Sequence, residues 1–150
     1  MNYEAYTDIR EGRDLRTFTF VSIGKKGAIP KCIFFEPTPI PYVYNFAFGN
    51  LLDNGGIDDA SVSDNGDRNK ILATLAKIIY QYTHKYPERK IYFRGSTEER
   101  TRLYRMAVGL NLEELSNDFE IYAEVDDSED FVPFCKNMKI NAFLIKRKIS

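Results

Sequence analysis

The feature that most constrains the fold of this 150-residue chain is the pattern of an amphipathic helix near its middle, over residues 67–86. Apolar side chains recur there at spacings of three and four residues, and Pro87 ends the pattern. The stretch Asp-Asn-Gly-Asp just before it supplies residues that cap a helix N-terminus. A helix with one apolar side needs an apolar surface to lie on. Its apolar positions are Ile71, Leu72, Leu75, Ile78, Ile79, Tyr82 and Tyr86.

That surface is predicted to be a β-sheet, because six stretches with strand-like patterns surround the helix. They occupy residues 17–24, 29–36, 42–50, 89–95, 118–125 and 141–148. A second helix is predicted at residues 96–110, followed by a connection that includes a turn of helix at 111–116. The order β-β-β-α-β-α-β-β predicts an α+β fold: a single mixed, mostly antiparallel sheet with two main helices packed on it.

Length and composition predict one soluble domain over residues 1–150, with a polar lead-in at 1–16 and a long loop at 51–66. The 21 basic and 22 acidic residues nearly cancel, which argues against attraction to nucleic acid or to an anionic membrane. No apolar run reaches the length of a membrane span, and the charged first residues do not resemble a signal peptide. We expect a cytoplasmic protein that is a monomer or a weak homodimer.

Few residues suggest metal binding or nucleophilic catalysis. Cys32 and Cys135 lie in strand-like contexts, so we expect buried or half-buried free thiols. His84 lies near the end of the first helix, where a solvent-exposed or dipole-capping role is expected. The loop at 51–66 is acidic but lacks the spacing of a calcium-binding loop. We therefore expect no metal site.

The stretch Phe-Arg-Gly-Ser-Thr-Glu-Glu-Arg-Thr-Arg-Leu-Tyr, residues 93–104, is the main candidate for a ligand site. A glycine between a strand and a helix exposes backbone N–H groups that can bind an anion. Arg100 and Tyr104 are four residues apart and share one flank of the helix. In the alternative interpretation Ser96 or Thr97 only caps the helix, and Arg100 packs on sheet aromatics. The candidate ligand-binding residues here are Arg94, Ser96, Thr97 and Arg100.

The helical spacing of this second helix also predicts which side is buried. Four apolar residues share one side, and Glu98 and Arg105 then point to solvent. Arg102 lies on one flank of the apolar side and the Arg100–Tyr104 pair on the other, at the edge of the core. The predicted buried residues are Leu103, Met106, Ala107 and Leu110.

Several segments resemble a small bacterial protein family of unknown function. They are Lys-Ile-Leu-Ala-Thr-Leu-Ala-Lys-Ile-Ile-Tyr-Gln-Tyr-Thr-His-Lys-Tyr-Pro at 70–87, Gly-Ser-Thr-Glu-Glu-Arg-Thr-Arg-Leu-Tyr-Arg-Met at 95–106 and Ala-Phe-Leu-Ile-Lys-Arg-Lys at 142–148. The resemblance covers most of the chain, from the first predicted hairpin to the last strand. It implies a soluble bacterial protein without an assigned activity.

The element order is also similar to the core of the GNAT-type N-acetyltransferases. Thr97, Arg100, Leu103 and Tyr104 match the spacing of the Asn-x-x-Ala-x-x-Leu-Tyr pattern in that superfamily. The resemblance implies that acyl-coenzyme A enters where the strand ending at Asn50 diverges from the strand at residue 91. It also implies that Tyr104 protonates the departing thiolate.

The loop that would bind the diphosphate of coenzyme A corresponds to residues 63–70. The segment keeps one glycine, Gly66, and only the free amides after it, with Arg68 and Lys70, favour a diphosphate. Asp64 and Asp67 depart from the pattern, because carboxylates facing a diphosphate would repel it.

Three hypotheses about function follow, and whether the protein is an enzyme stays open. The first is non-catalytic binding of an anionic small molecule or peptide, without a cofactor. The alternative is a GNAT-like acyltransferase that uses acyl-coenzyme A. A second alternative is a protein-interaction module, which would require exposed aromatic rows, although burial against the helices explains these rows more simply. The rows contain Phe18, Phe20, Tyr42, Tyr44, Phe46 and Phe48.

Overall fold

A computed structural model describes residues 4–13, 16–58, 64–110, 112–125, 131–134 and 140–148. Its helices are α1 (Arg68–Lys85), α2 (Glu98–Leu110) and α3 (Leu112–Asp118). Its strands are β1 (Arg10–Glu11), β2 (Thr17–Gly24), β3 (Gly27–Pro37), β4 (Val43–Leu51), β5 (Ile57–Asp58), β6 (Lys90–Phe93), β7 (Phe119–Val125), β8 (Phe131–Pro133) and β9 (Ile140–Arg147).

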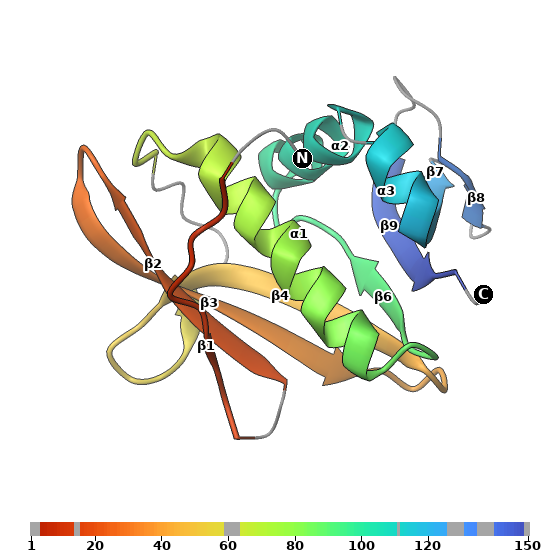
Figure 1. The fold of residues 1–150 in the computed structure, drawn as a ribbon, viewed down its shortest axis with the longest axis horizontal. Coiled ribbons are helices and arrows are strands. Elements are labelled where there is room, and N and C mark those ends of the chain that lie inside the picture. Colours follow the sequence, from red (N-terminus) through yellow and green to blue (C-terminus); the bar gives the residue numbers. More distant parts are fainter. Residues whose placement is uncertain are drawn as a thin grey trace. The chain divides into compact units, whose positions relative to one another are not determined.

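The fold is α+β with a mixed, mostly antiparallel sheet, as the sequence predicted (Figure 1). The hydrogen-bonded order is β1-β2-β3-β4-β6-β9-β7-β8, and β5 pairs with β4. The β4–β6 pair is parallel, whereas the β2–β3, β6–β9 and β7–β9 pairs are antiparallel. All six predicted strands and both main helices are present within a few residues of their predicted ends, and α3 is the predicted turn of helix.

Three short strands were missed by the sequence patterns. They are β1 in the polar lead-in, β5 in the long loop and β8 in the acidic segment before the last strand. Each has only two or three residues, too few for an alternating pattern to develop. Each exists because a longer neighbouring strand supplies its hydrogen-bonding partners.

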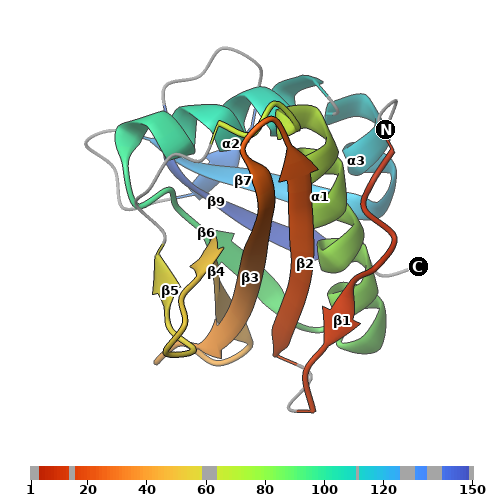
Figure 2. The ribbon, with the colours of Figure 1, turned by 90° about the vertical axis from the view of Figure 1, so that its left-hand side faces the viewer.

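The chain divides into two compact units. The first unit contains residues 1–36 and 47–85. In it α1 runs along β2 and β3 (Figure 2), with the Tyr82 ring stacked on Phe35 at 3.8 Å between centroids. Phe18, Phe20 and Ser22 alternate along β2 and are buried. The helix also buries two threonines that its apolar pattern did not include, Thr74 and Thr83.

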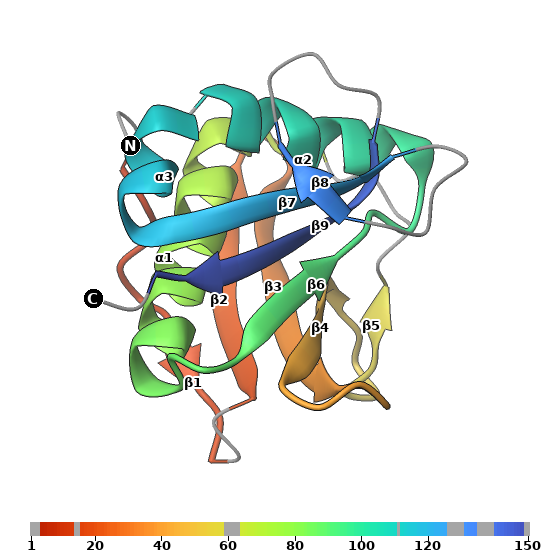
Figure 3. The same ribbon diagram turned by 90° about the vertical axis from the view of Figure 1, so that its right-hand side faces the viewer.

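The second unit contains residues 37–46 and 86–150. Its strands β6, β9 and β7 form adjacent ladders, with α2 and α3 beside them (Figure 3). Phe143 is central to its core, with ring centroids 5.0 Å from Phe93 and 5.2 Å from Phe134. The prediction of one domain from the chain length stays a prediction.

The aromatic rows that would have supported an interaction module belong mainly to the core. Phe18, Phe20, Phe46 and Phe48 are buried, and Tyr44 is half-buried. Tyr42 is the exception: its side chain is 62% exposed and its backbone has a φ of 65° in the turn before β4. Burial of the rows is therefore confirmed for the four phenylalanines.

Candidate anion-binding site

The start of α2, in the second unit, is held by contacts within the segment itself. The Thr97 Oγ1 accepts a hydrogen bond from the Arg100 N–H at 3.2 Å, so Thr97 is the N-cap, one of the two residues that the sequence offered for this position. The Gly95 N–H donates to Thr101 Oγ1 at 3.0 Å. The Gly95 N–H is therefore not one of the backbone N–H groups open to an anion, because the Thr101 hydroxyl already accepts it.

Gly95 has a different function, which is close packing. A Cβ atom added to Gly95 would lie 2.2 Å from the Thr101 backbone nitrogen, far inside van der Waals contact. The glycine between β6 and α2 therefore allows the strand end to approach the first turn of the helix.

The charged side chains around this helix start are balanced. Arg94 and Ser96 are exposed, Thr97 and Arg100 are half-buried, and Glu98 and Glu99 are exposed in the first turn of α2. Carboxylates in a first turn are favourable for the helix dipole but repel a bound anion. The formal charges of Arg94 and Arg100 are offset by those of Glu98 and Glu99, so these four residues leave no net positive charge at this end of α2.

Arg94 also has a partner on its own sheet. Burial raises the pKa of Tyr92, the negative charge of Glu124 adds to the rise, and Arg94 opposes it. The guanidinium thus belongs to a cluster of charged and phenolic groups on β6 and β7.

The buried side of α2 differs from the prediction. Met106 is 43% exposed and Leu103 is half-buried, whereas Tyr104 and Val108 are each 6% exposed. The Tyr104 ring meets Phe93 edge-on at 5.6 Å, so the helix is oriented to bury its largest aromatic side chain. Ala107 and Leu110, the other predicted members of the buried stripe, lie outside the residues whose side chains are described.

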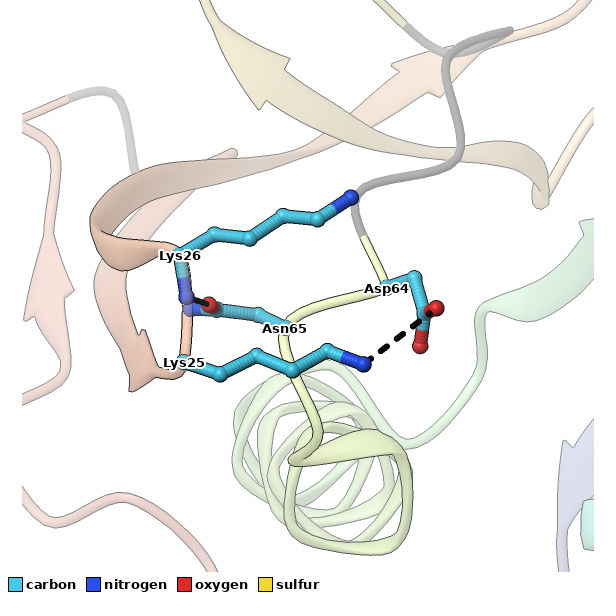
Figure 4. A network of polar contacts seen from close by, with 4 residues as sticks. All are labelled: Lys25, Lys26, Asp64 and Asn65. Carbon is cyan, nitrogen blue, oxygen red and sulfur yellow. Dashed lines mark hydrogen bonds and ion pairs between the residues drawn. The ribbon is translucent and has the colours of Figure 1, made fainter.

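The start of α1, in the first unit, is held by a distant hairpin. Asn65 is 3% exposed, and its Oδ1 accepts the Lys26 N–H at 2.6 Å in the β2–β3 turn (Figure 4). Its Nδ2 donates to Ser22 Oγ and to the Gly27 carbonyl, both at 3.0 Å. The Asn65 carbonyl accepts the Lys25 N–H at 3.2 Å. One buried amide thereby fixes the loop before α1 to the hairpin.

Gly24 makes this docking possible. A Cβ atom added to Gly24 would lie 1.8 Å from the Asn65 carbonyl oxygen. At the other end of the turn Gly27 has a φ of 94°, which glycine adopts without the steric cost of a side chain. The two glycines of the predicted hairpin therefore act differently, one by close approach and one by backbone conformation.

Asp67 occupies the N-cap position of α1, because its carbonyl accepts the Ile71 N–H at 2.9 Å. Its carboxylate is directed to the sheet: Oδ2 accepts hydrogen bonds from the Ser22 hydroxyl, at 2.5 Å, and from the Tyr6 hydroxyl. Among the described residues, Asp67 Oδ1 is buried without a hydrogen-bond partner. Burial and then the hydrogen bond to Asp67 raise the pKa of Tyr6. The carboxylate expected to repel an anion is thus engaged by two hydroxyl groups.

The side chains around this helix start are mainly cationic. Lys25 forms an ion pair with Asp64 at 3.6 Å, and the Lys25 and Lys26 side chains run along the loop before α1 (Figure 4). Arg68 and Lys70 are exposed in the first turn, which contains no acidic residue. Four cationic side chains against the carboxylates of Asp64 and Asp67 leave an excess of two formal positive charges.

Gly66 is exposed between these side chains. It has a φ of 81°, and nothing lies within 4 Å of the position a Cβ atom would take. We call the group formed by Lys25, Lys26, Gly66 and Arg68 the α1 basic site. Gly66 and Arg68 were predicted from the sequence, but the two lysines were not. Their position between two glycines indicated a turn and gave no sign of what packs on it.

A buried lysine in the first unit was also missed. Lys31 of β3 is 3% exposed, and its Nζ lies 2.6 Å from Asn50 Oδ1 and 5.8 Å from the Phe48 ring centroid. Lysine is rarely buried to this extent without polar partners, and the amide of Asn50 is one of them.

The cysteine and histidine residues lie apart from the two helix starts in the sequence. Cys32 is buried, as predicted, and burial raises the pKa of its thiol. Cys135 lies outside the described residues, and His84 is exposed in the last turn of α1. Among the described side chains, no group of three or more histidine, cysteine or acidic residues is arranged to hold a metal ion. None of the helices in the described ranges is both long and apolar enough to cross a membrane.

Comparisons with known proteins identify a family but not an activity. No curated protein and no solved structure matches the chain. A family model matches residues 2–148, nearly the whole sequence. The chain belongs to the family of unknown function DUF6934.

Proposed function

We propose that this protein binds an anionic small molecule or peptide, and that the α1 basic site is where the anion binds. The observation that carries the proposal is the positive charge at the start of α1. Cations exceed carboxylates there, and both carboxylates are engaged, Asp64 by Lys25 and Asp67 by two hydroxyl groups. The first-turn N–H groups and the helix dipole add to the attraction for an anion.

The start of α2 is the second location for the same function, with Arg94, Ser96, Thr97 and Arg100 as the ligand-binding residues. It is less favourable because Gly95 donates its N–H to Thr101 and because Glu98 and Glu99 offset the two arginines. The two locations can be distinguished by charge reversal at one helix start at a time.

The test is an amide-resolved NMR titration of the labelled protein with inorganic pyrophosphate at low ionic strength. We expect saturable shifts at residues 25–26 and 65–70, which Arg68→Glu removes and the matched control Arg94→Glu retains. A glutamate in the first turn is favourable for the helix dipole, so Arg68→Glu should remain folded. The reverse pattern would place the site at α2, and an absence of saturable shifts in the unmodified protein would refute anion binding.

The alternative function is a GNAT-like acyltransferase that uses acyl-coenzyme A. The observation that favours it is the short β4–β6 ladder, which has four residue pairs and ends at Phe46 and Phe93. β4 continues to Leu51 and pairs there with β5. A ladder continuing along the whole of β4 would have argued against this function. Tyr104 would be the general acid, and the α1 basic site would bind the diphosphate.

Acetyl-coenzyme A distinguishes this alternative from simple anion binding. We expect it to compete with pyrophosphate at residues 65–70 if the acyltransferase proposal is correct. Tyr104→Phe should then retain acetyl-coenzyme A binding and reduce release of free thiol with amine acceptors. No competition at millimolar acetyl-coenzyme A would reject the enzyme and leave the pyrophosphate result unaffected.

The proposal includes a cellular setting. The balanced net charge argues against nucleic acid or an anionic membrane as a partner. We propose a soluble, cytoplasmic protein that is a monomer or weak homodimer, and its bacterial origin follows from the family resemblance of segments such as residues 95–106.

A further inference from the structure

The outer face of the β2–β3 hairpin is apolar and exposed near its turn. Val21 pairs with Pro30 and Ile23 pairs with Ala28, and all four side chains are exposed. Val21 is 40% exposed and Ile23 is 60% exposed, although both are large β-branched residues. These four residues, called the hairpin face below, lie opposite the buried side of β2 formed by Phe18, Phe20 and Ser22.

Within the described part of the first unit, no helix lies over the hairpin face. α1 packs on the opposite side, where Tyr82 stacks on Phe35, and Figure 2 shows it behind the hairpin. The nearby N-terminal segment contacts the backbone of β2: the Ile23 N–H donates to the Tyr6 hydroxyl at 2.9 Å. The Tyr6 ring itself stacks on Phe20, on the buried side. The hairpin face is therefore left to solvent.

The turn adds positive charge to one end of this apolar surface. Lys25 and Lys26 connect the two strands directly, and both are exposed. Two acidic groups are described at this end of the hairpin: Asp64 pairs with Lys25, and Asp67 accepts hydrogen bonds from the Ser22 and Tyr6 hydroxyl groups on the buried side. Lys25 and Lys26 therefore belong both to the turn that ends the hairpin face and to the α1 basic site. A small anion would form ionic contacts with the lysines but would bury none of the apolar surface of the hairpin face.

We infer that the anionic ligand is an acidic peptide segment of another protein, bound in an extended conformation across the hairpin. Its apolar side chains lie on Val21, Ile23, Ala28 and Pro30, and its carboxylates meet Lys25 and Lys26. An extended chain directs alternate side chains to one side, which matches the cross-strand pairs of the hairpin face. Exposed apolar rows with a charged margin are typical of protein interaction surfaces. The inference rests on the proposed function and specifies its ligand class.

The test compares two labelled synthetic peptides of equal length and charge by fluorescence anisotropy. Both end in two glutamates; the preceding residues alternate valine with serine in the glutamate–valine peptide and are all serine in the glutamate–serine peptide. We expect the glutamate–valine peptide to bind about tenfold more tightly, because burying aliphatic side chains on the hairpin face favours binding. The double variant Val21→Thr, Ile23→Thr keeps β-branched residues in β2 and should abolish this difference without changing pyrophosphate binding. The double variant Lys25→Gln, Lys26→Gln should weaken both peptides.

Each other outcome is decisive. Equal affinity for the two peptides, with pyrophosphate still bound, overturns the peptide inference and leaves the proposed function standing. Preference for the glutamate–valine peptide without any pyrophosphate binding refutes the α1 basic site, and it supports the inference only if the lysine variant still weakens both peptides.

Binding to vesicles of one part phosphatidylserine to three parts phosphatidylcholine, lost in the threonine variant, would assign the hairpin face to a lipid surface. Concentration-dependent dimerisation lost in the same variant would assign it to a second copy of the chain. Either of these two results overturns the inference.

Discussion

At the start of α1 the chain is held by residues 43 and 39 positions away, through Asn65 to Ser22 and to Lys26. At the start of α2 the corresponding contacts, Thr97 with Arg100 and Gly95 with Thr101, span three and six positions. Both starts use a glycine for close approach, Gly24 at one and Gly95 at the other. The charges differ as well, since α1 begins among lysines and an arginine and α2 begins with two glutamates. A helix start built from its own segment is readable in the sequence, whereas one built on a distant hairpin is not.

The largest expected effect is at the close approach between the hairpin and the loop. Gly24→Ala should lower the free energy of unfolding by about 3 kcal/mol, because the new Cβ atom would overlap the Asn65 carbonyl. Denaturant unfolding measures the loss. Gly27→Ala is the matched control, since its cost is backbone strain in open space, about 1 kcal/mol. Equal effects of the two substitutions would show that the loop is not packed on Gly24.

The next effect compares the distant contact with the local one directly. Asn65→Ala removes hydrogen-bond partners from Lys26 N–H, Ser22 Oγ and the Gly27 carbonyl, and should cost about 2–3 kcal/mol. Thr97→Ala removes one N-cap hydrogen bond and should cost about 1 kcal/mol. Equilibrium unfolding of the two variants under the same conditions gives the difference. A larger loss for Thr97→Ala would reverse the comparison.

A smaller effect concerns the hydroxyl groups around Asp67. Tyr6→Phe should cost about 1 kcal/mol, because Asp67 Oδ2 and the Ile23 N–H each lose a partner. The phenylalanine ring can still stack on Phe20 as the tyrosine ring does. Tyr92→Phe in the second unit is the matched control, since Tyr92 has a different set of neighbours, Glu124 and Arg94. Retention of full stability in Tyr6→Phe would show that the hydroxyl contributes nothing.

The smallest effect is on the pH dependence of stability. The folded-state pKa of Tyr6 lies above its ordinary value of 10.0, so the folded protein retains the phenolic proton at a pH where the unfolded chain loses it. The stabilisation is therefore complete below pH 10 and is lost as the pH rises through the folded-state pKa. Tyr6→Phe should reduce the fall in the free energy of unfolding above pH 10, as denaturant titrations at several pH values would measure. Identical slopes in the two proteins would contradict the assigned pKa direction.

Much of the fold was predictable because its long elements carry their own patterns. β2 has the predicted bounds Thr17–Gly24, and α1 lies within one residue of the predicted 67–86 at each end. The prediction for α2 was less accurate in its orientation. Its spacing favoured Met106 as a buried residue, but packing against Phe93 buries Tyr104 instead. An apolar stripe gives one candidate orientation of a helix, and the neighbouring ring selects another when it offers a better contact.

The sequence by itself determined the six longer strands, the helices and a cap at Ser96 or Thr97, since these depend on residues a few positions apart. Only the tertiary structure decided that Asn65 docks on the hairpin turn and that the Asp67 carboxylate is directed to Ser22 and Tyr6. It also brought Lys25 and Lys26 to the start of α1. The reason is physical. The hydrogen bond between Asn65 and Ser22 joins residues 43 positions apart, so it requires the hairpin and the start of the helix to be packed together. A local pattern of apolar residues does not specify which turn of the chain packs against which loop.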